Sequence, residues 1–119
     1  MLILTKPILK ELRHNSTKAG IGFDPVPVLK LFNPCGAATW LVSEIAEDND
    51  TMFGIADLGF GSPEIGYFSL REIMAVRLPF GLRMERDKSF KGAAPLSKYA
   101  DEARAQGCLA QAIDSVNNG

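Results

Sequence analysis

The residue types that could do chemistry gather in one glycine-rich stretch, FGIADLGFGSPEIGYFSL, at residues 53–70. Gly61 and Gly66 have the spacing of the glycines in a phosphate-binding P-loop. Tyr67 and Phe68, however, stand where a P-loop has the lysine that holds phosphate and the hydroxyl that holds magnesium. We therefore expect no bound nucleotide and no other cofactor. Instead, we predict two strands joined by a turn in which glycines take positive φ angles.

Two acids of this stretch are candidate functional groups. Asp57 is either a turn cap that accepts hydrogen bonds from backbone N–H groups, or a partly buried acid. We favour the turn cap, because a carboxylate just before glycines commonly ties a turn together. Glu64 lies in the turn, where we expect it to be solvated. A small enzyme built on Asp57, Glu64 or Glu85 ranks last among the functions that we consider.

Histidine and cysteine give no catalytic or metal-binding set. His14 is the only histidine, and we place it at the end of a surface helix, where its charge would favour the helix dipole. Cys35 and Cys108 are 73 positions apart and have no metal-ligand spacing around them. A nucleophile at Cys35 would need a base, and only His14 could serve, so we favour an idle thiol. We predict a protein that is not an enzyme, with no catalytic residues and no metal.

The charges are unevenly distributed along the chain. Residues 44–64 contain six acids and no Lys or Arg, whereas residues 71–98 contain seven bases and three acids. The plainer interpretation is that both segments are only solvated surface. The alternative is a surface with two poles. Its acidic side would bind a basic protein through Glu47, Asp48, Asp50, Asp57 and Glu64. Its basic side would bind nucleic acid through Arg83, Arg86, Lys88 and Lys91, with Phe80, Phe90 or Tyr99 to stack on bases.

The elements that must position these residues follow from periodicity and capping signals. Thr5 caps a first helix, Ser69 with Glu72 forms a capping box for a short middle helix, and Pro95 starts a last helix that Gly107 interrupts. Strands are predicted at residues 26–33, 38–45, 51–58, 65–68 and 81–87.

This order predicts an α+β fold in which an antiparallel meander of about five strands carries the N-terminal, middle and C-terminal helices on one side. Its core should contain Leu29, Leu31, Trp40, Leu41, Phe53, Ile55 and Phe68.

Length and composition are those of one globular domain, residues 1–119. Apolar residues make up 46% of the chain, charged residues 23%, and the net charge is −1, which gives no overall attraction to nucleic acid or membrane. The N-terminus MLILTKPILK lacks the features of a signal peptide, and no apolar run is long enough to span a bilayer. We expect a cytoplasmic protein with no membrane partner.

Several segments resemble a small bacterial family that is catalogued only as a domain of unknown function. They are VLKLFNPCGAATWLVSE, FGIADLGFGSPEIGYFSL, MERDKSF and PLSKYADEAR, within about residues 25–104. Residues 106–119 form a C-terminal extension outside the resemblance.

The resemblance implies a gene of plasmids, phages and integrative elements, often near anti-restriction genes, and it supplies no catalytic residues. We therefore expect a protein-interaction module of a mobile genetic element, such as an anti-restriction or anti-CRISPR inhibitor of a host nuclease. The alternative is a small nucleic-acid-binding accessory protein of plasmid or phage maintenance.

Overall fold

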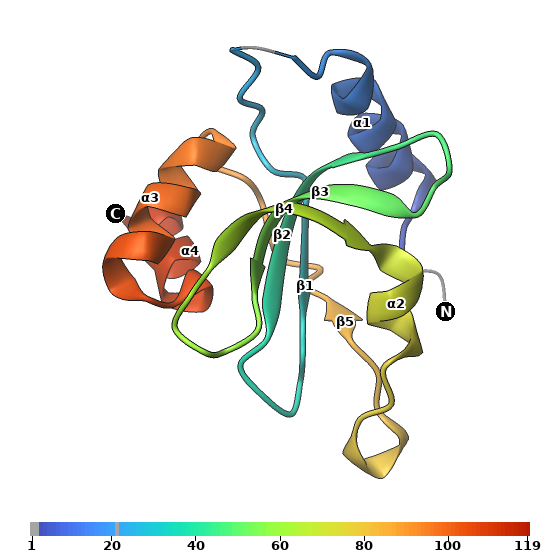
Figure 1. Cartoon of the computed structure of the whole chain (residues 1–119), viewed down its shortest axis with the longest axis vertical. Helices are drawn as coiled ribbons and strands as arrows, with labels where there is room; N and C mark the ends of the chain where they lie inside the picture. Colours follow the sequence, from blue (N-terminus) through green and yellow to red (C-terminus); the bar gives the residue numbers. More distant parts are fainter. Residues whose placement is uncertain (1–2, 21) are drawn as a thin grey trace.

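Four strands that follow one another in the chain form most of an antiparallel sheet, as the computed structural model shows for residues 3–20 and 22–119 (Figure 1). They are β1 (Leu29–Phe32), β2 (Thr39–Ile45), β3 (Thr51–Asp57) and β4 (Glu64–Ser69). The short β5 (Glu85–Arg86) then pairs with β1, so the strand order is β4-β3-β2-β1-β5. The α+β fold with a five-stranded antiparallel sheet is confirmed.

The helices begin at the residues that the capping signals indicate. The Thr5 hydroxyl accepts the Ile8 N–H at the start of α1 (Lys6–Thr17), and the Ser69 hydroxyl accepts the Glu72 N–H at the start of α2 (Leu70–Ala75). The interruption at Gly107 is also confirmed, because this residue has a φ of 69° between α3 (Leu96–Gln106) and α4 (Leu109–Asn118).

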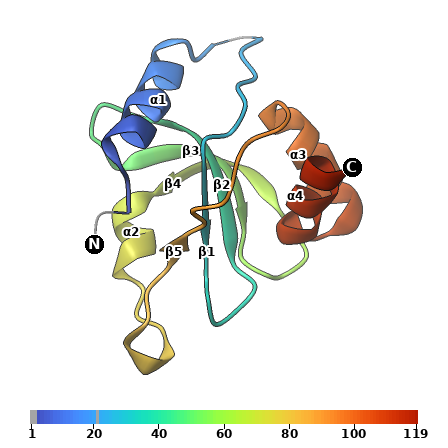
Figure 2. The ribbon, with the colours of Figure 1, turned by 180° about the vertical axis from the view of Figure 1, so that it is seen from behind.

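The helices cover both faces of the sheet, so the expectation of helices on one side is wrong (Figures 1 and 2). Trp40 and Val42 pack with α1 and α2 on one face, whereas Leu41 and Ile55 pack with α3 and α4 on the other. The signal was present in β2, where Trp40, Leu41 and Val42 form a continuous apolar run. Such a run is typical of a strand that is buried on both faces, whereas a one-sided sheet gives strict alternation.

Most of the predicted core is confirmed. Buried side chains include Leu29, Leu31, Trp40, Leu41 and Ile55. Phe53 and Phe68 are only half-buried. Phe68 lies on β4, which has a neighbouring strand on one side only, and Phe53 lies on β3 beside it.

The last strand is much shorter than the predicted 81–87. Residues 78–82 form a loop instead, which a hydrogen bond of 3.0 Å from the Leu78 N–H to the Leu82 carbonyl closes. This loop contains the 3₁₀ turn η1 (Pro79–Gly81), in which Phe80 has a φ of 63°. Gly81 also has a positive φ, of 73°, and a left-handed residue cannot continue a strand, so the predicted strand could not begin at residue 81.

Candidate functional site

The glycine-rich stretch forms two strands and a turn, as predicted. The turn between β3 and β4 has positive φ angles of 94° at Gly59 and 84° at Gly61. These glycines therefore serve the conformation of the turn.

Asp57 is both buried and a cap, which combines the two interpretations of this residue. Its side chain is 3% exposed. One carboxylate oxygen accepts the Gly59 N–H at 2.8 Å, and the other accepts the Leu109 N–H at 2.9 Å, at the start of α4. Both oxygens are thus used inside the fold, and Asp57 offers no surface to a partner.

Two acids of the β2–β3 loop also make internal hydrogen bonds. Asp48 is exposed, but the Thr51 hydroxyl, the Thr51 N–H and the Asp50 N–H all donate to its carboxylate and lower its pKa to about 2. Asp50 accepts the hydroxyl of Ser69 and the N–H of Arg71, and so ties this loop to the start of α2. Both carboxylates therefore maintain the loop.

The five candidate acids do not form one surface. Glu64 pairs with Ala56 at one end of β3, whereas Asp50 precedes Thr51 at the other end. Five residue steps along a strand separate these ends by about 17 Å. Of the five, Glu47 and Glu64 are exposed and make no recorded hydrogen bond or ion pair within the described residues. Glu85 of the enzyme hypothesis lies on β5, at the opposite edge of the sheet from Glu64.

The structure does bring the candidate bases together, along β5 and the residues on either side of it. Arg86 and Lys88 line three shallow hollows of about 470, 370 and 450 Å³, of which Arg83 lines the first and Lys91 the second. Arg83 donates to the Met74 carbonyl at 2.8 Å. The Nε atom of Arg86 is buried and has no hydrogen-bond partner in the structure.

Of the three aromatic residues that were candidates for stacking, only Phe80 is free to do so. Phe80 is 96% exposed, whereas Tyr99 is fully buried and accepts the Ala93 N–H with its hydroxyl. Phe90 is half-buried against the core formed by α3 and α4. Tyr99 and Phe90 are therefore corrected from candidate base contacts to structural residues.

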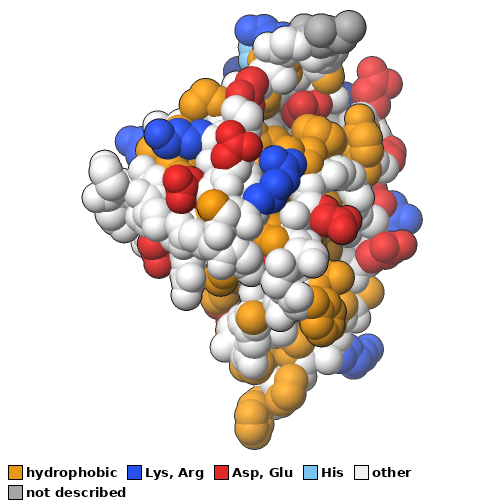
Figure 3. Space-filling view, turned by 60° about the vertical axis from the view of Figure 1, so that its left-hand side comes forward, with side chains coloured by type: hydrophobic (Ala, Val, Ile, Leu, Met, Phe, Trp, Pro, Cys, Tyr) orange, Lys and Arg blue, Asp and Glu red, His pale blue; other side chains and the backbone are white. Residues whose placement is uncertain are grey.

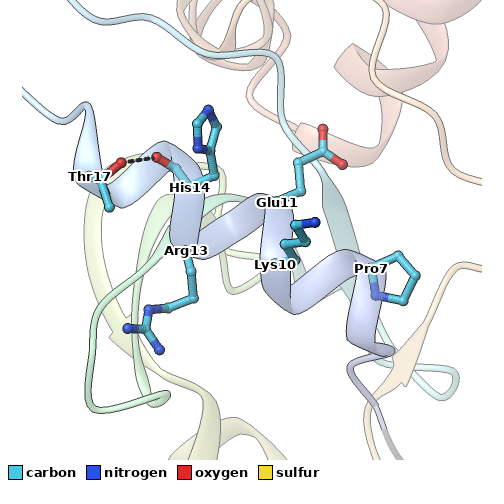
Figure 4. A pocket seen from close by; sticks show the side chains of 6 residues that line it. All are labelled: Pro7, Lys10, Glu11, Arg13, His14 and Thr17. Carbon is cyan, nitrogen blue, oxygen red and sulfur yellow. Dashed lines mark hydrogen bonds between the residues drawn. The ribbon is translucent and has the colours of Figure 1, made fainter.

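His14 lies on the outer face of α1, beside an open hollow of about 580 Å³ (Figure 4). Figure 4 shows Arg13 pointing away from the side that carries His14 and Glu11. Among the described residues, no carboxylate or nucleophile forms a hydrogen bond with the His14 ring. The Thr17 hydroxyl instead donates to the backbone carbonyl of His14. Among the described residues, the side chains that line this hollow therefore form no hydrogen-bonded acid–base pair with His14.

A row of three side chains across the sheet was missed by the sequence analysis. Phe53 of β3 lies opposite Glu44 of β2 and also opposite Tyr67 of β4, so all three project from the face that α3 and α4 partly cover. The Phe53 and Tyr67 rings are 5.0 Å apart between centroids. Burial raises the pKa of the Glu44 carboxyl, and none of the ion pairs recorded among the described residues involves it.

Large apolar side chains are exposed next to this row. Tyr67 is 76% exposed and Ile65 is 40% exposed on β4, while Phe60 in the preceding turn is 86% exposed. Leu58, Phe60 and Glu64 border a shallow hollow of about 240 Å³ together with Ala56, on the opposite face of the sheet from this row. We call the five residues along this edge, on its two faces, the β4 surface: Leu58, Phe60, Glu64, Ile65 and Tyr67.

The backbone of β4 is free along its outer edge, because β4 ends the sheet. The Leu70 N–H donates to the Asp50 carbonyl at 2.9 Å, which marks these two residues as a hydrogen-bonded pair. Alternation along an antiparallel ladder then directs the N–H and C=O groups of Glu64, Gly66 and Phe68 toward β3. The same groups of Ile65 and Tyr67 point outward.

No helix among residues 3–20 and 22–119 is long and apolar enough to cross a membrane. In the same part of the chain, no three His, Cys, Asp or Glu side chains group so as to hold a metal ion.

No curated protein matches the chain significantly, and no solved structure does so. One family model, described as "Protein of unknown function (DUF2958)", matches residues 3–110, so the chain belongs to this family.

Proposed function

We propose that this protein is a non-enzymatic protein-interaction module that binds an extended segment of a partner along the free edge of β4. The observation that carries the proposal is the combination of this open edge with exposed apolar side chains and the half-buried Glu44 carboxylate. The segment would add a strand to the sheet and extend a Lys or Arg side chain over the Tyr67 and Phe53 rings toward Glu44, which lies three strand spacings, about 14 Å, from the added strand.

The edge of β4 supports strand addition because it lacks the usual protection. Natural edge strands commonly carry lysine, proline or a bulge that prevents pairing with another chain. The six residues of β4, EIGYFS, contain no lysine or proline, and their pairing with β3 is regular from Thr51 to Ala56. The outward N–H and C=O groups of Ile65 and Tyr67 are therefore available to a second chain, and backbone hydrogen bonds of this kind provide affinity in peptide recognition.

The row formed by Glu44, Phe53 and Tyr67 supports a basic side chain in the partner. Burial makes the charged form of Glu44 unfavourable, and a cation that extends toward it across the Tyr67 and Phe53 rings would offset part of that cost. The Phe53 and Tyr67 rings adjoin the same position, and aromatic faces attract Lys and Arg by cation–π interaction. A neutral or acidic segment would gain neither contribution, so the row would select for charge.

A basic partner also suits the context that the family resemblance implies. Nucleases of host defence systems need positive charge to hold phosphate, and a protein of plasmids or phages would meet them in the cytoplasm. We propose such a nuclease as the partner class, and inhibition as the consequence of binding. We place the contact at β4 rather than at the β2–β3 loop, because the carboxylates of Asp48 and Asp50 accept hydrogen bonds within the fold.

The experiment is a selection from a displayed library of random peptides by the purified full chain. We expect enrichment of peptides in which apolar residues alternate with others and one position is Lys or Arg. Tyr67→Ala and Glu44→Gln should each weaken binding of a synthesised winning peptide at least several-fold. The matched controls are Phe80→Ala, an exposed aromatic residue elsewhere, and Glu47→Gln, an exposed acid of the β2–β3 loop.

The proposal is refuted if no peptide is enriched, or if the controls weaken binding as much as the β4 variants do. Enrichment of acidic peptides would also contradict it, because Glu44 and Glu64 would then repel the ligand. A binding constant for the winning peptide that is independent of Glu44→Gln would remove the cation site from the proposal.

A further inference from the structure

The loop between α2 and β5 projects from the body of the protein and carries an exposed aromatic residue at its tip. It is the lowest part of the ribbon in Figure 1, and apolar side chains cover the lower tip in Figure 3. Phe80 is 96% exposed, and Val76 and Leu82 are 42% and 38% exposed. We call residues 76–83 the arm.

Backbone hydrogen bonds close the arm around its tip, where one residue has a left-handed conformation. The Leu78 N–H donates to the Leu82 carbonyl, and the Leu82 N–H donates to the Pro79 carbonyl. Phe80 has a φ of 63°, a conformation that is uncommon for a bulky residue and that Gly would adopt more easily. Ordinary packing does not explain an aromatic residue here, because its side chain contacts almost nothing in the fold. A binding role would explain it.

Positive charge flanks the tip and continues along β5. Arg77 and Arg83 are exposed on the two sides of the arm, and Arg86 and Lys88 follow at alternate positions in and just after β5. In residues 76–91 there are five bases and two acids. One of these acids, Asp87, is already paired with Lys30 at 3.3 Å.

This line of charge indicates which class of ligand fits. A membrane that touched the tip would meet Arg77 and Arg83 only, because Arg86 and Lys88 lie on the way back to the sheet, away from a plane laid against the tip (Figure 1). A linear polyanion can follow all four. Nucleic acid is such a polyanion, and it also offers base faces or base steps to an exposed ring.

We propose that the arm and β5 form a nucleic-acid-binding site, in which the Phe80 ring stacks on or wedges between bases and the flanking bases hold phosphates. Arg83 is positioned for this by its bond to the Met74 carbonyl, which uses one of its terminal nitrogens. The site lies at the opposite edge of the sheet from the β4 surface, so it is independent of the protein-binding proposal.

The test is fluorescence anisotropy of the full chain with short labelled DNA, single-stranded and duplex, between about 50 and 200 mM salt. Phe80→Ala should weaken binding by about 5- to 150-fold, the range measured for loss of one stacked base, without changing the salt dependence. Arg83→Gln and Lys88→Gln should each reduce the slope of log affinity against log salt by about 1. Phe60→Ala, which removes an equally exposed ring at the far edge, should leave binding unchanged.

A second readout reports directly on base contact. The base analogue 2-aminopurine in the probe becomes brighter when it is unstacked, so the wild-type chain should change its fluorescence and Phe80→Gly should not. Gly suits the positive φ at this position, so loss of signal in that variant cannot be attributed to unfolding.

The proposal is overturned by any of three results. One is the absence of DNA binding at about 50 mM salt, where electrostatic binding is strong. Another is equal affinity of Phe80→Ala and Phe60→Ala. The third is stronger binding to vesicles of anionic phospholipid than to DNA, which would assign the arm to a membrane surface.

Discussion

Removal of the Asp57 carboxylate should separate α4 from the sheet. Asp57 is 3% exposed, and its oxygens accept the Gly59 N–H at 2.8 Å and the Leu109 N–H at 2.9 Å. A hydrogen bond to a charged group contributes roughly 1.5–3 kcal/mol, so Asp57→Ala should lower the free energy of unfolding by about 3–6 kcal/mol. Domains of this kind are stable by about 5–15 kcal/mol, so the loss is a large fraction of the total. Asp57→Asn keeps one acceptor and should cost about half as much.

The two faces of the sheet provide separate probes for this prediction. Trp40, the only tryptophan, is buried on the face that α1 and α2 cover, whereas α3 and α4 pack on the other face. In urea unfolding of the wild-type chain, far-UV circular dichroism and Trp40 fluorescence should change together. In Asp57→Ala, helical signal should be lost before the fluorescence changes, because Leu109 at the start of α4 has lost its partner.

A destabilisation below about 1 kcal/mol, the contribution of an ordinary neutral hydrogen bond, would refute this reasoning. So would a Glu64→Ala control with the same effect, because Glu64 is exposed at the end of the same turn and caps nothing in the described structure.

Three further predictions concern the strands and the acids. Gly54→Ala should cost about 3 kcal/mol in urea unfolding, because a Cβ there would lie 1.9 Å from the Leu41 carbonyl oxygen, whereas Gly66→Ala should be nearly neutral with nothing within 4 Å. Asp48→Asn should reduce the loss of unfolding free energy between about pH 4 and pH 2, as measured by urea unfolding at a series of pH values. Hydrogen bonds from the loop lower the Asp48 pKa from 3.8 to about 2, so its contribution is present above pH 3.8 and is lost as pH falls toward about 2. Glu44→Gln should be more stable than wild type at about pH 7 but not at about pH 4. Burial raises the folded-state pKa of Glu44 above 4.5, so wild-type stability falls as pH rises through that window, and equal curves would refute this.

The starts of α1 and α2 and the end of α3 could be predicted from the sequence because the responsible interactions are local, whereas α1 continues to Thr17, beyond the end expected near His14. Thr5 and Ser69 bond to N–H groups three residues ahead, and Gly107 adopts a left-handed conformation that few other residues tolerate. The turn at Gly59 and Gly61 is local for the same reason. These signals act over a few residues, so no tertiary information is needed to detect them.

The number of covered faces was also encoded in the sequence, although our prediction was wrong. The continuous apolar run in β2 and the apolar faces of the last two helices were both visible. Two apolar surfaces of this kind require burial on both sides of the sheet.

The turn cap at Asp57 was predicted from the sequence, whereas the candidate binding row and the bond from Leu109 to Asp57 were decided only by tertiary structure. The bond from Leu109 to Asp57 joins residues 52 positions apart, and no local pattern indicates it. The pairing of β2 with β3 shifts by one residue between Val42 and Glu44, which places Glu44 opposite Phe53. Continued from Val42 and Gly54 without that shift, the register would turn Glu44 to the other face of the sheet. A bulge depends on how both strands pack against the helices, so the sequence determined the strands, and the fold determined which side chains meet across them.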